Sequence, residues 1–227
     1  GVLDAFVRGD ASGVIAREGC GNVPLMVARA IIALSHDEPP RRFPKKRALS
    51  FDSRTGARDR SGFDQGLLRI DAATGNRTTV STGGSLTDPI ALALESDGNI
   101  VVVDQASGVV RVDPSSGAQS VVSSGGLFVR PVSVAVEAGG GILVGDRDAF
   151  GGGGGVIRID PATGAQAVVS SGGLFVNPAG IAVDGNGFIL VADPTARKLI
   201  GVDPVSGAQS AISSAGILYA PFGVAIE

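Results

Sequence analysis

Three aspartates recur at equivalent positions of a repeated pattern, each at the end of a short apolar run. Asp104 follows "NIVVV", Asp146 follows "GILVG" and Asp193 follows "FILVA". Carboxylates gathered around one opening would bind calcium or a polar ligand. An aspartate at a strand end also caps its own turn by accepting backbone N–H bonds. Because a residue present in each repeat is better explained by a repeated structural role, we favour turn capping and keep the metal site as the alternative.

The segment "DRDAFGGGGG" (146–155) interrupts the repeat and is the best candidate for ligand specificity. Arg147, Asp148 and Phe150 would offer charged and apolar contacts there. No Lys-Ser/Thr pair follows the five glycines and no helix is expected to begin there, so the segment does not resemble a phosphate-binding loop. We expect a flexible tongue in preference to a ligand clamp.

Three further polar residues lie near the same loops. Arg130 and Asn177 occupy the same variable position just before a proline of the repeat, and Arg197 lies in the loop after Asp193. They are candidate ligand contacts, although solvent-exposed polar residues at such positions need no ligand to explain them.

The residue types of the repeats give little support for catalysis. The only histidine, His36, lies outside the repeats, so the repeats hold no imidazole for general-base catalysis or zinc binding. The only cysteine, Cys20, can form no internal disulfide. The residue types therefore favour a binding protein over an enzyme.

The candidate residues belong to a unit that repeats along most of the chain. Asp71, Asp113, Asp160 and Asp203 are separated by 42, 47 and 43 residues, and Pro89, Pro131, Pro178 and Pro221 keep the same three intervals. The phrase "VVSSGGLFV" occurs at both 121–129 and 168–176. Agreement between independent landmarks indicates a true structural repeat.

Each unit divides into four short apolar runs joined by turn sequences. A glycine turn such as "SDGN" follows the first run, and "DPSSGAQ" or a close variant joins the third to the fourth. Four-stranded meanders repeating every ~40–45 residues are typical of β-propeller blades. The apolar residues after the glycine pair should then pack between adjacent blades; they are Leu127, Phe128 and Val129, with the copies Leu174, Phe175 and Val176.

We therefore expect an all-β chain: a β-propeller of four-stranded antiparallel blades with three complete blades and a partial blade at each end. The blades should span about 89–123, 131–170 and 178–213, with partial blades at about 48–82 and 221–227. Either the chain is part of a longer product or its open edges are covered in another way. In the first partial blade, 48–52 and 61–65 could act as a degraded first half, or the C-terminal strand could pair there; self-association is a further possibility.

The runs "GIAVDGNGFILVAD" (180–193) and "RVDPSSG" (111–117) resemble the NHL-repeat family of propellers, and the resemblance covers about residues 66–227. Similar propellers include binding modules, gluconolactonase-like hydrolases and lyases of the virginiamycin B type. The alternative function is thus a calcium-dependent hydrolase or lyase that uses Asp104, Asp146 and Asp193 and completes its site in further blades. Against it, such a lyase would be expected to use histidine, and Glu95 and Glu137 lie at the opposite ends of their blades.

Net charge and the length of the apolar runs limit the classes of partner that we expect. Residues 66–227 carry 8 Lys/Arg against 14 Asp/Glu, a net charge of −6, which disfavours nucleic acid. No run reaches the ~18–20 apolar residues of a membrane span. Residues 1–47 lack the repeat and should form a leader, with a short helix beginning near Asn22 and a basic linker, or no stable fold. We expect a protein or small polar ligand on the loop-rich face, and we favour an extracytoplasmic or secreted location.

Overall fold

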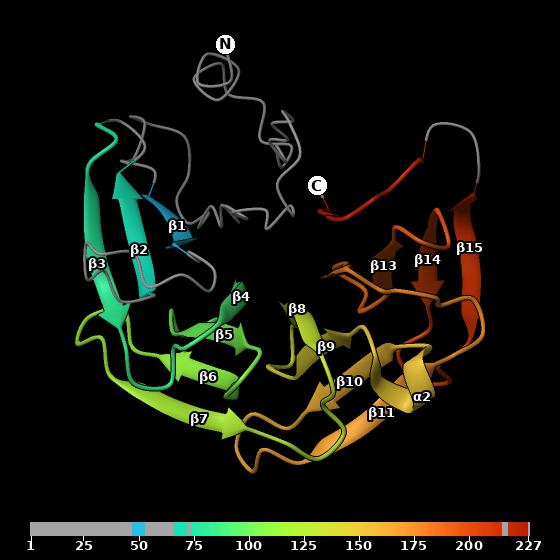
Figure 1. The fold of residues 1–227 in the computed structure, drawn as a ribbon, viewed down its shortest axis with the longest axis horizontal. Coiled ribbons are helices and arrows are strands. Elements are labelled where there is room, and N and C mark those ends of the chain that lie inside the picture. The colour runs from blue at the N-terminus through green and yellow to red at the C-terminus, as the bar shows by residue number, and fades with distance from the viewer. Residues whose placement is uncertain (1–46, 53–65, 72–73, 215–217, 227) are drawn as a thin grey trace.

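The computed structural model describes residues 47–52, 66–71, 74–214 and 218–226. The strands of these segments form four antiparallel sheets, which follow one another in an arc around a common axis (Figure 1). Strands β4 and β8 lie toward this axis, while β3, β7, β11 and β15 lie on the perimeter. This arrangement confirms an all-β propeller architecture. The helix expected near Asn22 and the histidine at position 36 lie outside the described residues.

The strand bounds follow the repeat. The first blade contains β1 (Arg47–Asp52), β2 (Gly66–Asp71) and β3 (Arg77–Thr82). The second blade contains β4 (Pro89–Leu94), β5 (Ile100–Asp104), β6 (Gly108–Val112) and β7 (Gln119–Ser123). The third contains β8 (Pro131–Val136), β9 (Ile142–Asp146), β10 (Gly155–Ile159) and β11 (Gln166–Ser171). The fourth contains β12 (Gly180–Val183), β13 (Ile189–Asp193), β14 (Lys198–Val202) and β15 (Gln209–Ser214).

The first blade has three described strands. Residues 47–52 pair antiparallel with β2, which gives them the place that the second strand holds in the other blades. Residues 61–65, the other part of the expected first half, lie outside the described residues.

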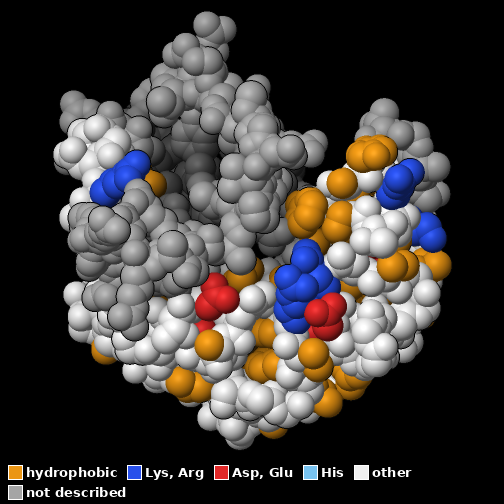
Figure 2. Space-filling model, viewed as in Figure 1, with side chains coloured by type: hydrophobic (Ala, Val, Ile, Leu, Met, Phe, Trp, Pro, Cys, Tyr) orange, Lys and Arg blue, Asp and Glu red, His pale blue; other side chains and the backbone are white. Residues whose placement is uncertain are grey.

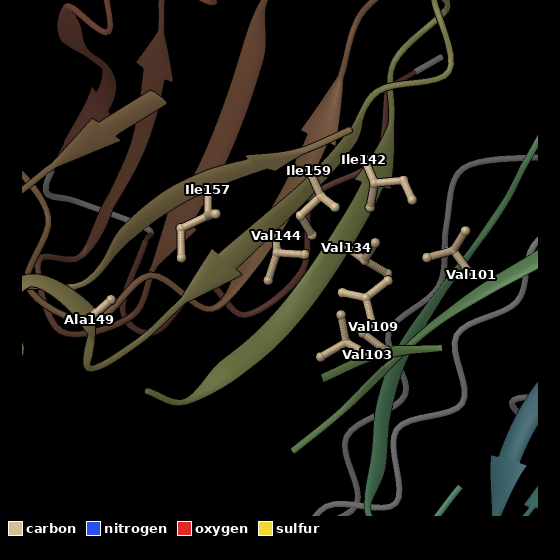
Figure 3. Close-up of a cluster of buried hydrophobic side chains, with 10 residues drawn as sticks. Val101, Val103, Val109, Val134, Ile142, Val144, Ala149, Ile157 and Ile159 are labelled. Carbon is tan, nitrogen blue, oxygen red and sulfur yellow. The ribbon is translucent and has the colours of Figure 1, made fainter. Parts of the chain in front are cut away.

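The core lies between blades, and β5 shows how side-chain alternation builds it. Val101 and Val103 pack toward the third blade, whereas Ile100 and Val102 pack toward the first blade and its Leu67. All five side chains are fully buried, because successive residues of a strand point to opposite faces of the sheet. Burying such a side chain contributes about 1.5–3 kcal/mol. Figure 3 shows Val101, Val103 and Val109 beside the third-blade residues of the same cluster: Val134, Ile142, Val144, Ala149, Ile157 and Ile159.

Glutamine and serine side chains join neighbouring blades along the perimeter. Nε2 of Gln119, at the start of β7, donates to Oγ of Ser81 in β3 over 2.8 Å, and that hydroxyl donates to the carbonyl oxygen of Gly117 over 2.7 Å. Gly117 has a φ of +73°, and a side chain there would collide with the carbonyl oxygen of Val80. The next two junctions repeat these bonds with Gln166 and Ser123, and with Gln209 and Ser170. The recurring "GAQ" and "SSGG" sequences therefore hold consecutive blades together.

The phrase shared by 121–129 and 168–176 also supplies apolar contacts between blades, as its sequence predicts, but only in part. Phe175 is buried, and Leu127, Phe128 and Leu174 pack against the core clusters. The prediction is wrong for the last residue of each copy: Val129 is 65% exposed and Val176 is 49% exposed. Their backbone N–H groups bind the buried carboxylates of Asp146 and Asp193, so the valines adjoin the connection between blades while their side chains remain in solvent.

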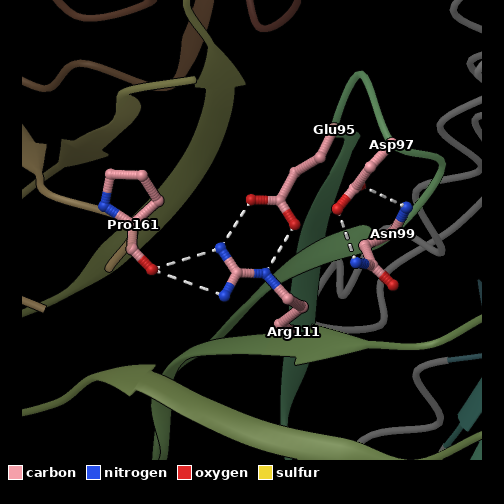
Figure 4. Close-up of polar contacts among 5 residues, drawn as sticks. All are labelled: Glu95, Asp97, Asn99, Arg111 and Pro161. Atoms are coloured by element: carbon pink, nitrogen blue, oxygen red, sulfur yellow. Dashed lines mark hydrogen bonds and ion pairs between the residues drawn. The ribbon is translucent and has the colours of Figure 1, made fainter. Parts of the chain in front are cut away.

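An arginine on the third strand of a blade links that blade to the next one. Nε and Nη2 of Arg111 donate to the two carboxylate oxygens of Glu95, each over 2.6 Å, and the same guanidinium reaches the carbonyl oxygen of Pro161 at 3.4 Å (Figure 4). Arg158 repeats this pattern with Glu137 and Pro204. These glutamates are therefore committed to ion pairs within the scaffold.

Residues 218–226 form no strand, although the repeat predicts the first strand of a further blade there. The segment runs beside the fourth blade, since a Cβ atom on Gly180 would lie 3.1 Å from the Cα atom of Gly223. Among the described residues, none of the four sheets contains this segment, and it therefore does not pair with β1 as a strand.

Candidate functional site

The loop-rich face is formed by the segments that precede the first strand of each complete blade, together with the loops between the second and third strands. It comprises residues 87–88, 105–107, 129–130, 147–154, 176–177 and 194–197. Each pair of segments is brought together by the aspartate that ends the second strand. These aspartates are the recurring carboxylates that the sequence singles out.

Asp146 shows the arrangement in detail. It is fully buried at the end of β9. One carboxylate oxygen accepts the N–H of Val129 at 2.8 Å, the other accepts the N–H groups of Asp148 and Ala149 at 3.1 and 2.9 Å, and the N–H of Arg130 lies 3.0 Å from both. One side chain therefore fixes both the turn that follows its strand and the approach to β8.

Asp104 and Asp193 are equally buried and make equivalent bonds. Asp104 accepts the N–H groups of Thr87, Asp88, Ala106 and Ser107, and Asp193 accepts those of Val176, Asn177, Thr195 and Ala196. The structure thus shows the turn-capping role that the repeat predicts.

The same geometry bears on the metal hypothesis. Within the described segments no three His, Cys, Asp or Glu residues lie close enough together to hold a metal ion. The three aspartates occupy separate corners of separate blades, and their oxygens already accept backbone hydrogen bonds.

Arg130, Arg147 and Asp148 do come together at the third blade. Nη1 of Arg130 lies 3.6 Å from Oδ2 of Asp148, and both side chains are about half exposed. Burial and then the positive charge of Arg130 lower the pKa of Arg147, while Asp148 and Asp193 oppose this shift. Arginine nevertheless stays charged at neutral pH. The corner therefore holds two guanidinium groups close enough to repel each other.

Arg147 is half-buried, and its Nε atom is buried without a hydrogen-bond partner among the described residues. Its main chain is well held: the N–H donates to the carbonyl oxygen of Arg130 over 3.0 Å, and its own carbonyl lies against Gly154. Gly154 in turn packs against Pro178, the residue after Asn177. The loop is thus positioned between the third and fourth blades.

The segment 147–154 contains a single helical turn, α2 (Ala149–Gly152). This turn begins before the glycine run (151–155), and strand β10 begins at the last residue of the run, so no helix begins there, as the sequence predicts. The turn does not continue because Phe150 and Gly151 adopt φ angles of +56° and +80°, outside the right-handed helical region. Ala149 is fully buried and anchors the turn, while the ring of Phe150 lies over Gly155 and remains 37% exposed.

The two candidate residues of the fourth blade lie apart from this cluster in their contacts. Asn177 donates from Nδ2 to Oγ1 of Thr195 over 3.2 Å, and its buried Oδ1 has no hydrogen-bond partner among the described residues. The guanidinium of Arg197 lies over the ring of Tyr219, 4.8 Å from its centroid. Arg197 is therefore engaged with the C-terminal segment.

Asp88 is a charged residue of this face that the sequence analysis missed. It occupies the position before the blade proline that Arg130 and Asn177 occupy in the next two blades. Burial and then the charge of Asp104 raise the pKa of Asp88. The sequence carries the signal, because Asp88 precedes Pro89 as Arg130 precedes Pro131.

The molecular surface shows charged and apolar side chains side by side. On the face that carries α2, a group of Lys/Arg and Asp/Glu side chains lies next to hydrophobic ones (Figure 2). Apolar residues of the loop-rich face that remain exposed include Val129, Phe150 and Val176. Among the described residues no helix has the length and apolarity needed to cross a membrane.

The solved structures that are similar to this chain include the following two. A chain of the nidogen/laminin complex matches with a TM-score of 0.60 and 17% identity, over 70% of this chain and 59% of that one. A structural genomics protein of unknown function from Bacteroides thetaiotaomicron matches with a TM-score of 0.56 and 17% identity, over 74% of this chain and 44% of that one. No family model and no curated protein matches.

This chain therefore spans about half the length of the solved chains that it resembles. At this level of identity the likeness shows the fold. Fold and geometry together define a class: a β-propeller whose buried aspartates support a loop-rich face of mixed charged and apolar character.

Proposed function

We propose that this chain is an NHL-type propeller that acts as a binding scaffold, with a protein partner held on the loop-rich face. The observation that carries the proposal is the loop 147–154, which presents Arg147, Asp148 and Phe150 above a corner that each complete blade builds in the same way. Binding residues commonly lie on loops held by a rigid scaffold.

The residue types of this face suit a protein partner. Arginine and aromatic residues are enriched in protein interfaces and dominate their binding energy. Here Arg130 and Arg147 lie on the same face as the exposed side chains of Val129 and Phe150. One of the similar solved structures is itself a complex, of nidogen and laminin, which supports an interaction role for this fold.

The second blade supplies a matched loop for the test. Its β5–β6 loop contains only Gln105, Ala106 and Ser107, and the strand ends on both sides keep the same register, with Asp104 opposite Gly108 and Asp146 opposite Gly155. Replacing residues 147–154 with Gln-Ala-Ser would give the third blade the corner of the second. The capping carboxylate and both strands would remain.

Wild-type and loop-swapped proteins should be immobilised and compared by quantitative mass spectrometry for what they retain from an extract of the expressing cells. We expect one or more proteins to be retained by the wild type and lost from the swapped protein. Val205→Ser is the control, because this 95% exposed side chain lies in a turn that does not belong to the loop-rich face. Equal retention by wild-type and loop-swapped protein, with the swapped protein folded by circular dichroism, would refute the proposal.

A further inference from the structure

We propose that Arg147, assisted by Arg130, binds the carboxylate of an acidic side chain in an extended segment of the partner. This inference rests on the proposed function and adds the chemistry that the partner must present. It is carried by the Nε atom of Arg147, which is buried without a hydrogen-bond partner among the described residues, and by the long ion pair of Arg130 with Asp148.

The guanidinium of Arg147 has N–H donors that are available to a ligand. A guanidinium carries five N–H donors, and the buried Nε of Arg147 has no hydrogen-bond partner among the described residues. Two carboxylates act on its charge, those of Asp148 and Asp193. The Asp193 oxygens already accept the N–H groups of Val176, Asn177, Thr195 and Ala196. Asp193 therefore offers long-range attraction without offering Arg147 a free acceptor.

Arg130 is compensated only weakly. Its contact with Asp148 is 3.6 Å long and joins two half-exposed side chains. Ion pairs between solvent-exposed side chains contribute little to stability. A carboxylate from a partner could replace Asp148 at small cost, and its binding would relieve the repulsion between the two guanidinium groups.

The half-buried position of Arg147 should make it the stronger of the two anchors. Electrostatic attraction is greater where water is excluded, and the fixed geometry of the loop reduces the entropy lost on binding. A planar guanidinium also binds a carboxylate through two parallel hydrogen bonds.

The surroundings indicate a peptide rather than a free anion. Val129 and Val176 immediately precede the two variable positions, Arg130 and Asn177, and both valine side chains lie in solvent. Apolar side chains that alternate with an acidic one in an extended segment would cover the valines while the carboxylate reaches the arginines. A free phosphate would leave this apolar surface exposed.

The test uses the whole chain and a short fluorescein-labelled peptide of alternating glutamate and leucine, with fluorescence anisotropy as the readout. The matched peptide carries glutamine in place of glutamate. We expect the glutamate peptide to bind at least about tenfold more tightly than the glutamine peptide, and its affinity to fall as salt is added.

Four variants sharpen the result. Arg147→Gln should weaken binding of the glutamate peptide about tenfold. Arg147→Lys should recover only part of this loss, because an ammonium group cannot form two parallel bonds to the carboxylate. Asp148→Asn should tighten binding, since it removes the competing carboxylate without removing the N–H that caps Asp146. Arg77→Gln, on the outermost strand of the first blade, makes the same change in net charge and should have no effect.

Equal affinity for the two peptides would overturn the inference, as would equal losses in the Arg147→Gln and Arg77→Gln proteins. Competition by inorganic phosphate that is stronger than competition by unlabelled glutamate peptide would instead assign the arginines to a phosphate ligand. The loop-swapped protein separates this inference from the proposed function. If the swap abolishes partner retention and Arg147→Gln leaves it intact, the binding face stands and the acidic anchor fails.

Discussion

The corners at the ends of β5 and β9 have the same capping aspartate but carry loops of different length. In both, a fully buried aspartate accepts backbone N–H groups from the segment before the blade proline and from the turn after its own strand. Above Asp104 the chain returns after residues 105–107, whereas above Asp146 it makes the longer excursion 147–154. The repeated carboxylate belongs to the scaffold, and the unrepeated loop is the part that we propose for partner recognition.

The same two corners differ in charge. The second blade presents Asp88 before its proline, and the third presents Arg130 at that position with Arg147 beside it. The segment before the proline is held by the capping aspartate in the same way in both blades. A single substitution at that position therefore changes the charge of the corner and leaves these backbone bonds in place. A repeat protein can in this way vary what it binds while keeping the fold constant.

The largest expected effect comes from removing the buried carboxylates. Asp104→Ala and Asp146→Ala should each lower the free energy of unfolding by at least about 3 kcal/mol, because several buried N–H groups lose their acceptor. Urea denaturation followed by circular dichroism measures this. The comparison requires similar losses at both corners, and a loss below about 1 kcal/mol at either corner would contradict the scaffold role.

A smaller effect is expected in acid, at the turns between third and fourth strands. Hydrogen bonds from the hydroxyl and N–H of Ser115 and from the N–H of Ser116 lower the pKa of Asp113 from 3.8 to about 2. The pKa of Asp160, at the same position of the third blade, is lowered chiefly by the N–H of Thr163. A lowered pKa in the folded state means that the ionised form stabilises the fold, so this contribution is present above pH 3.8 and is lost as the pH falls toward 2.

Carboxyl chemical shifts recorded by NMR across this pH range would test the turns directly. Ser115→Ala should raise the pKa of Asp113, because the hydroxyl of Ser115 is the largest cause of its shift. The pKa of Asp160 should not change, because its carboxylate is bonded by Thr163 and Ala162 of its own turn and not by Ser115. A rise at both aspartates would show that the turns are coupled and would weaken the comparison of independent blades.

The smallest effect is expected from calcium. The carboxylates of Asp104, Asp146 and Asp193 already accept backbone hydrogen bonds, so millimolar calcium should leave the melting temperature unchanged. A rise in the melting temperature, which tight binding to the folded state would produce, would return the metal-dependent enzyme to consideration. Asp146→Asn would then show whether the ion binds at this corner.

Much of this architecture can be predicted from the spacing of a few residues. The shared intervals of the blade prolines and turn aspartates predict the blades, and the glycine of each "GAQ" turn predicts the positive φ that the structure shows at Gly117, Gly164 and Gly207. The turn-capping role of Asp104 was predicted from the repeat as well. In each case the interacting groups lie within one blade or at its junction with the preceding chain, so the repeat places them.

Contacts between blades required the tertiary structure. The sequence contains Gln119 and Ser81, or Arg158 and Pro204, without indicating that they meet, because their separation depends on how one twisted sheet lies against the next. The sequence likewise does not indicate that Arg147 is partly buried, or that the charges of Arg130 and Asp193 act on it. Residues 218–226 give the converse case: their sequence matches a strand, yet none of the described sheets contains this segment. Local spacing determined the strands and turns of this protein, and the packing of blades decided which side chains meet, since that packing depends on relative orientation and sequence spacing does not record it.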